Sequence, residues 1–349
     1  MGANKKSKKK KTSVGAKIGH VIVTIIITIV FLLIACIGVI FILEKGPSET
    51  AKTLFVTSCN ESSAMGFLST MFLSQEEVDE IMDKTKMAEI GEGETNDDSL
   101  ITVDESTTTD EVEVIDITGG SYKGKLMIVH DPSKVFMGTV ETFGETEGLV
   151  VADIAARYDN IIGGVNGGDF VDAGSYAYTA QPLGAVISNG EVVYRDSEDD
   201  STIYHLSGFT KDNKFFMGNI TINDALEMGV RDAVYTVHET GPFLVMDGEA
   251  LVNEVPDSAT YGGGKNPRTA IGQRADGAVL LLVIDGRQAD SLGATFKDLA
   301  YVMLENGAVN ACAMDGGTSS QMYYNGEVIN NPYSPTGPRK CPTAWLVQG

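Results

Sequence analysis

Four two-residue turn signals limit the folds open to this chain more than any other feature of the sequence. They are Asn189-Gly190, Asp247-Gly248, Asp276-Gly277 and Asn325-Gly326. Asn-Gly and Asp-Gly pairs favour the two positive φ angles of a tight β-hairpin turn. The flanking segments are apolar or β-branched: 183–188 with 191–195, 243–246 with 249–253, 269–274 with 278–285, and 321–324 with 327–330. We therefore predict several antiparallel hairpins.

Helical patterns are fewer in this part of the chain. Apolar residues recur at helical spacing in 148–159, and a short helix is expected over 222–228 with Thr221 as its cap. The clearest pattern covers 294–306, where Thr295 and Asp298 have capping spacing and Asn306-Gly307 marks the end. We predict an α+β domain over residues 112–349. It would be mostly antiparallel β-sheet with several hairpins and a few packed helices.

The N-terminus has the pattern of a membrane anchor. Seven of the 26 basic residues lie within the first 17 positions, and an uncharged apolar segment of 23 residues follows at 21–43. About 20 apolar residues suffice to cross a bilayer. The apolar segment is long for a cleaved signal peptide, and no small-residue cleavage pattern follows it. We predict a transmembrane signal anchor over 21–43, a cytoplasmic basic tail over 1–20, and an extracellular remainder.

Two regions separate this anchor from the predicted domain. Residues 44–90 read as a stalk, with a helix over 75–90 that begins at a capping box formed by Ser74 and Glu77. Residues 91–111 are rich in Glu, Asp, Thr and Gly and contain few apolar side chains. Such a composition buries too little surface to offset chain entropy, which predicts an acidic flexible linker.

Charge and cysteine content narrow the function. The chain has 48 acidic residues, so the part beyond the basic tail is strongly acidic and would repel nucleic acid. Four cysteines are too few for a disulfide scaffold. Cys312 and Cys341 could pair in an oxidising exterior or remain as buried thiols. Nothing in the sequence indicates the oligomeric state.

Five short segments place polar groups at the ends of apolar strands, where scaffolds often present chemistry. They are Gly163-Gly164-Val165-Asn166-Gly167-Gly168-Asp169-Phe170, Asn266-Pro267-Arg268-Thr269-Ala270-Ile271-Gly272, Ile284-Asp285-Gly286-Arg287, Met314-Asp315-Gly316-Gly317-Thr318-Ser319-Ser320, and Ile329-Asn330-Asn331-Pro332 followed by Gly337-Pro338-Arg339. Any one of them could be an ordinary turn.

In this order the five segments resemble the phosphodiester glycosidase family, over about residues 112–347. The resemblance implies hydrolysis of a sugar-1-phosphodiester, which releases the sugar and leaves a phosphomonoester. Thr318 stands where bacterial members often have a third glycine, so it restricts the backbone there. The family also includes bacterial proteins described as exopolysaccharide-related.

The resemblance carries over to specific residues. Asp285 and Asp315 are the expected catalytic carboxylates, because glycosidases generally use two carboxylates at the sugar. Arg268 and Ser319 are expected to hold the phosphate, since guanidinium and hydroxyl donors suit its negative charge. The other residues expected at the phosphate or substrate are Thr269, Asn166, Gly167, Gly168, Gly286, Arg287, Gly316, Gly317, Thr318, Ser320 and Asn330.

Three functions therefore remain open. The favoured one is a membrane-anchored extracellular hydrolase of phosphodiester-linked cell-envelope glycans. A non-catalytic polysaccharide-binding protein of exopolysaccharide export or attachment is the second, and a phosphodiesterase that cuts the P–O bond is the third. No cofactor is indicated. A divalent cation at Asp169 and Asp172 is conceivable, but two oxygen ligands are too few to specify a site. Glu239, after His238, is a weaker candidate for a general acid.

Overall fold

The computed structural model describes residues 14–62, 65–104, 106, 108–171, 179–236, 243–252, 263–334 and 337–349. Its helices are α1 (Val14–Lys45), α2 (Glu49–Asn60), η1 (Gly66–Leu68), α3 (Gln75–Lys84), η2 (Asp98–Leu100), η3 (Pro132–Lys134), α4 (Val151–Ala155), α5 (Ile222–Glu227), α6 (Phe296–Glu305) and η5 (Gly317–Ser319). Its strands are β1 (Val112–Thr118), β2 (Lys123–Val129), β3 (Val135–Thr139), β4 (Ile161–Asn166), β5 (Ala185–Ser188), β6 (Glu191–Arg195), β7 (Ile203–Thr210), β8 (Phe215–Thr221), β9 (Val230–Tyr235), β10 (Phe243–Met246), β11 (Glu249–Ala250), β12 (Arg268–Arg274), β13 (Val279–Ile284), β14 (Ala308–Met314), β15 (Met322–Tyr324), β16 (Glu327–Val328) and β17 (Thr343–Gln348).

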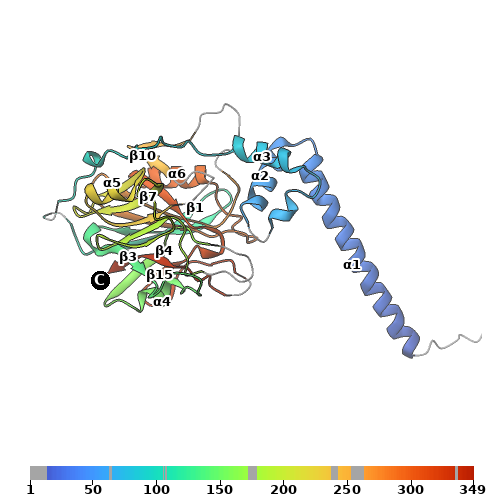
Figure 1. Cartoon of the computed structure of the whole chain (residues 1–349). Helices are drawn as coiled ribbons and strands as arrows, with labels where there is room; N and C mark the ends of the chain where they lie inside the picture. Colours follow the sequence, from blue (N-terminus) through green and yellow to red (C-terminus); the bar gives the residue numbers. More distant parts are fainter. Residues whose placement is uncertain are drawn as a thin grey trace, which may run out of the picture.

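The strands form three sheets. The largest has the order β1-β2-β13-β12-β14-β10-β11, and two five-stranded sheets have the orders β16-β15-β4-β17-β3 and β6-β5-β9-β7-β8. Neighbouring strands pair antiparallel. The predicted α+β class, mostly antiparallel with packed helices, is therefore confirmed (Figure 1).

Hairpins occur at all four turn signals. Asn189-Gly190, Asp247-Gly248 and Asn325-Gly326 each have positive φ at both residues, as the short hairpin turn requires. At Asp276-Gly277 only the glycine is left-handed, with φ 90°. The turn between β12 and β13 is accordingly longer than a two-residue turn, and Arg274 N–H instead bonds the carbonyl of Ala278.

The predicted helices are present but shorter than expected. Helix α6 begins after Thr295, whose hydroxyl accepts from Asp298 N–H while the Asp298 carboxylate accepts from Thr295 N–H. Helix α5 has the same arrangement with Thr221 as its cap. Helix α4 spans only five residues of the expected 148–159.

The seven-stranded sheet separates two apolar cores. Strand β13 is buried along its whole length and alternates between them. Leu281 and Val283 face a core shared with the two smaller sheets, which includes Phe209 and Trp345. Leu280, Leu282 and Ile284 face α6 on the other side. This central position holds the ends of β12, β13 and β14 rigidly.

Helix α1 projects away from the sheets, with α2 and α3 between it and the domain (Figure 1). Its segment Lys17–Lys45 is long and apolar enough to cross a membrane. Helix α3 has the expected Ser74–Glu77 capping box but ends at Lys84, not at residue 90. Val56, Leu73 and Val78 form a small separate core in this unit. Residues 1–13 of the expected cytoplasmic tail lie outside the described residues.

The acidic segment expected to be a flexible linker is instead bound to the domain. Asn96 is buried, and its side chain donates to the carbonyl of Phe215 and accepts from Met217 N–H at 2.7 Å. Ile101 is buried in the main core and Met87 in the core beneath α6. The Ile101 side chain and the Asn96 amide at the edge of β8 thus hold part of this segment against the sheets, which its composition did not indicate.

The two candidate disulfide partners are separate buried thiols. Cys312 lies on β14 and its Sγ is 3.0 Å from Ser207 Oγ, whereas Cys341 Sγ is 3.5 Å from the carbonyl of Leu149. Of the two alternatives left open by the sequence, the structure has the unpaired one.

Candidate functional site

The structure brings the five sequence segments together at one edge of the seven-stranded sheet. Across the β12–β13 pair Arg268 faces Ile284, and across the β12–β14 pair Thr269 faces Met314. The residues that follow these strands, Asp285 and Asp315, therefore lie at the same edge. Strand β4 belongs to another sheet, yet its end joins them, since Asp315 N–H donates to the carbonyl of Gly167 at 3.2 Å.

Asn166 connects these strand ends and is not available to a ligand. It is fully buried, and its Nδ2 donates to the carbonyl of Asp315 at 2.7 Å. Its Oδ1 accepts from the Thr269 hydroxyl at 2.8 Å and from Gln321 N–H at 3.2 Å. Both side chains expected at the substrate, those of Asn166 and Thr269, thus have protein partners in this structure.

Most of the expected ligand-binding glycines are required by close backbone packing. A Cβ atom on Gly167 would lie 2.3 Å from Thr343 Oγ1, and one on Gly168 would lie 2.3 Å from the carbonyl oxygen of Tyr235. A Cβ atom on Gly286 would lie 2.5 Å from the Pro267 nitrogen, and one on Gly316 would lie 2.9 Å from the Pro267 carbonyl oxygen. Real Cβ atoms do not approach so closely, so these positions admit only glycine without rearrangement.

Gly317 differs from the other glycines, because it adopts a left-handed φ of 60° and lies beside an arginine. A Cβ atom there would be 3.5 Å from both terminal nitrogens of Arg287. Thr318 does not have positive φ, so the turn accommodates its side chain without backbone strain. Ser320 is buried, and its hydroxyl makes no hydrogen bond to any described residue.

Asp285 joins two loops through one of its carboxylate oxygens. Its Oδ1 accepts from Asn330 Nδ2 and from Asn331 N–H, both at 2.9 Å. Asn330 in turn accepts from Met322 N–H and donates to the carbonyl of Ser320. Asn330, expected at the substrate, thus links Asp285 to the chain around Ser320 and Met322. Asp285 Oδ2 makes no hydrogen bond to the described part of the chain, which leaves it free for a substrate or water.

Asp315 has the most perturbed carboxyl group of the site. Its carboxylate accepts from the Ser319 hydroxyl and from Gly316 N–H, and both contacts favour the charged form. Burial and the negative charge of Asp169 oppose them and raise the pKa of Asp315 to about 7. A carboxyl group with such a pKa can both donate and accept a proton near neutral pH.

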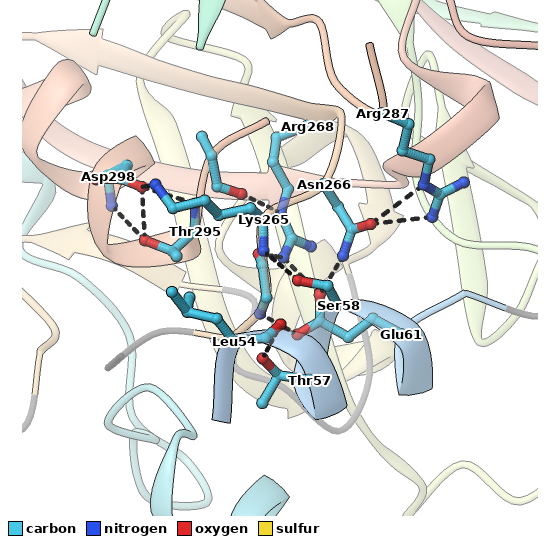
Figure 2. Close-up of polar contacts among 12 residues, drawn as sticks. Leu54, Thr57, Ser58, Glu61, Lys265, Asn266, Arg268, Arg287, Thr295 and Asp298 are labelled. Atoms are coloured by element: carbon cyan, nitrogen blue, oxygen red, sulfur yellow. Dashed lines mark hydrogen bonds and ion pairs between the residues drawn. The ribbon is translucent and has the colours of Figure 1, made fainter. Parts of the chain in front are cut away.

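Arg268, the expected phosphate ligand, is occupied by Glu61, the C-cap residue of helix α2. Its guanidinium donates to Glu61 Oε2 at 2.6 Å and to the carbonyls of Gly264 and Ala294 (Figure 2). It also stacks 3.8 Å from the ring centroid of Phe296. Both ionic side chains are only 8% exposed. Sequence reasoning missed this contact because Glu61 lies outside every recognisable motif.

Arg287 is a second cation at the site. Its Nε and one terminal nitrogen donate to Asn266 Oδ1, at 3.2 and 3.1 Å. No carboxylate of the described residues forms an ion pair with it. Burial and the positive charge of Arg268 lower the pKa of Arg287. The residue also has φ 58°, a conformation that side chains seldom adopt.

Possible metal ligands lie elsewhere. Among the described residues, Glu111, Glu113 and His130 place ligand atoms within 4.8 Å of one another. They sit at the end of β1 and β2 that aligns with the start of β13, opposite Asp285. Asp169 is buried, and its Oδ1 accepts from Phe170 N–H. Its suggested partner Asp172, like His238 and Glu239, is outside the described residues.

The comparisons with known proteins agree with these motifs. A family model described as phosphodiester glycosidase matches residues 159–348. An uncharacterized SPbeta prophage-derived protein of Bacillus subtilis strain 168, YomE, is 28% identical over 269 residues. That alignment covers 71% of this chain and 39% of the relative, so the chain spans about two fifths of the relative's length.

A solved structure shares the fold. The catalytic domain of zebrafish N-acetylglucosamine-1-phosphodiester α-N-acetylglucosaminidase, auto-inhibited by its pro-peptide, aligns with a TM-score of 0.57 and 24% identity. The alignment covers 73% of this chain and 88% of that one. A hypothetical protein from Synechocystis aligns with a TM-score of 0.46 and 14% identity, over 68% of this chain and 61% of that one.

Proposed function

Because the chain belongs to the phosphodiester glycosidase family, we propose that it hydrolyses the bond between a sugar's anomeric carbon and a phosphodiester oxygen. Water adds to the anomeric carbon, the carbon–oxygen bond breaks, and the phosphate keeps the bridging oxygen. The products are a free sugar and a phosphomonoester. The observation that carries the proposal is Asp315, a carboxyl group with a pKa of about 7 in the loop against which Arg287 lies.

The two carboxylates take the sugar side of the reaction. The transition state builds positive charge on the anomeric carbon, which a nearby carboxylate stabilises. Asp285 Oδ2 supplies that charge, since Oδ1 is held by Asn330 and Asn331. Asp315 moves the proton, either to the leaving oxygen or from the attacking water. Asp285 and Asp315 thus both act at the sugar, as the sequence motifs led us to expect.

The phosphate side is assigned to Arg287 in place of Arg268. Arg268 already donates to Glu61, Gly264 and Ala294, whereas Arg287 has no carboxylate partner among the described residues. The buried Ser320 hydroxyl is a further donor, and it has no hydrogen-bond partner among the described residues. Preorganised donors of this kind stabilise the negative charge that develops on a leaving phosphate.

We also propose the location. The Lys17–Lys45 helix spans a membrane, its basic flank stays in the cytoplasm, and the sheet domain faces outward. Phosphodiester-linked glycans of a cell envelope would then be within reach of the site.

An oxygen-labelling experiment tests the reaction. The full chain, in detergent micelles, is incubated with UDP-sugars and sugar-1-phosphodiesters in heavy-oxygen water. Label in the released sugar is expected. Label in the phosphate would instead identify cleavage of the P–O bond, and binding without turnover across the panel would favour a polysaccharide-binding protein.

A further inference from the structure

The juxtamembrane helix α2 is closely packed on the P-R-T segment of the sheet domain. Ser58 Oγ accepts from Lys265 N–H at 2.9 Å, and Glu61 Oε1 accepts from Gly264 N–H at 2.7 Å. A Cβ atom on Gly264 would lie 2.3 Å from Ser58 N, so only glycine lets the helix approach this closely. The contact is therefore specific to these two surfaces and is not a loose meeting of stalk and domain.

Glu61 supplies the charge that this contact needs. Burying an arginine without a partner is costly, whereas a well-bonded pair compensates much of that cost. Glu61 Oε2 accepts both from Arg268 at 2.6 Å and from Asn266 Nδ2 at 2.9 Å. Together with Gly264 N–H, the carboxylate has three donors and is fixed in one orientation.

Asn266 transmits that orientation to the candidate site. An amide whose nitrogen donates to Glu61 must present its oxygen on the other side. That oxygen accepts from two nitrogens of Arg287, at 3.2 and 3.1 Å (Figure 2). With the amide reversed, its NH2 group would face the guanidinium and repel it. The conformation of Arg287 beside Gly317 thus depends on a carboxylate from α2.

We infer that Glu61 is a positioning residue of the candidate site, which acts through Asn266 to hold Arg287 ready for the substrate's phosphate. The juxtamembrane segment then completes the site, and does not merely connect it to the membrane. This inference rests on the proposed function for its substrate. The contrary role for the same contact is that Glu61 occupies an anion site at Arg268 and keeps phosphate out.

The two roles predict opposite effects of removing the carboxylate. The full chain is compared as wild type, Glu61→Ala, Glu61→Gln, Asn266→Ala and the matched control Ser58→Ala, which removes another α2 contact without touching Asn266. Sugar-1-phosphodiester turnover and the affinity for inorganic phosphate are both measured. We expect the Glu61 and Asn266 variants to lose about tenfold in phosphate affinity and to show a raised KM. Ser58→Ala should keep both values.

Chemical rescue separates positioning from folding. Acetate fits the space left in Glu61→Ala, and we expect it to restore KM and phosphate affinity in a saturable manner, with chloride of equal ionic strength as the control. A variant damaged only in folding would show a smaller active fraction with unchanged KM. Unchanged or tighter phosphate binding in Glu61→Ala and Glu61→Gln would overturn the inference, the tighter binding by showing that Glu61 excludes phosphate.

The same measurements distinguish this inference from the proposed function. A wild-type chain that binds phosphate but turns over no sugar-1-phosphodiester, with binding weakened in Glu61→Ala, refutes the reaction and keeps the positioning role. Turnover that is equal in wild type and the Glu61 variants, at equal KM, keeps the reaction and refutes the positioning role.

Discussion

Asn166 Nδ2 donates a 2.7 Å hydrogen bond to the main-chain carbonyl of Asp315, so one amide joins the end of β4 to the end of β14. These strands belong to different sheets. Asp315 N–H also donates to the carbonyl of Gly167. These two hydrogen bonds fix the backbone position of Asp315 and hence the Cα atom from which its carboxyl group extends. The site is thus built on the seam between two sheets.

Removing this amide should cost stability. Asn166→Ala leaves the Thr269 hydroxyl, Gln321 N–H and the Asp315 carbonyl without their buried partner. We expect the free energy of unfolding to fall by about 2–4 kcal/mol. Urea denaturation of the variant measures the loss. Asn223→Ala, an exposed position on α5, is the control and should change little. Equal stability of the two variants would contradict the account.

The pH dependence of stability tests the state of Asp315. Its folded-state pKa is raised to about 7 from an ordinary value of 3.8, so the folded protein holds this proton more tightly than the unfolded chain. Ionisation therefore destabilises the fold as pH rises from about 4 to about 7. We expect Asp315→Asn to be more stable than wild type at pH 8 and equal to it at pH 4.

Thermal unfolding of both chains at several pH values measures this difference. Asp153→Asn, which changes an exposed acid, should show no such pH-dependent gain. A gain for Asp315→Asn that is the same at pH 4 and pH 8 would mean that the carboxyl is not perturbed.

The buried ion pair of Arg268 with Glu61 should contribute more to the free energy of unfolding than an exposed ion pair on the same strand. Arg268→Gln leaves Glu61 buried without its counter-charge, which we expect to cost about 3–5 kcal/mol. Arg274→Gln breaks an exposed ion pair with Asp276 at the other end of β12 and should cost less than about 1 kcal/mol. Chemical denaturation of the two variants compares them. A similar small loss in both would show that α2 is not held by this pair.

Substitution should weaken phosphate binding at Gly317 but not at Thr318. Gly317→Ala places a Cβ atom at φ 60° beside Arg287, so we expect it to lose about 1–2 kcal/mol of stability. Phosphate affinity should fall with it. Thr318→Gly should leave affinity within about twofold, because the backbone there needs no left-handed conformation. Calorimetric titration with inorganic phosphate checks both, and a larger loss for Thr318→Gly would reverse the assignment.

The sequence predicted the fold well where a structural element depends only on residues close to it in the chain. Asn-Gly pairs located hairpins, and Thr295 with Asp298 located the start of α6, because each depends on neighbours in the chain. The composition around Asn96 and Ile101 predicted a flexible segment. This segment is instead held by contacts with the edge of β8, more than 100 residues away in the chain.

In the candidate site, too, the sequence located the motifs but not their long-range contacts. The order of the motifs indicated that Asp285 and Asp315 belong together, and the strand register places both at one edge. Which side chains remain free could not be predicted. Asn166 and Asn330 are used internally, and Arg268 is paired with a residue 207 positions away. Such partners follow from the three-dimensional packing, which the motifs do not encode.

The rate of sugar-1-phosphodiester hydrolysis by Asp315→Asn, measured at pH 7 beside the wild-type chain, tests the central claim most directly. The account predicts a loss of at least about 100-fold in kcat, because the amide cannot move a proton, while the fold is retained. An unchanged rate in a folded Asp315→Asn variant would contradict it.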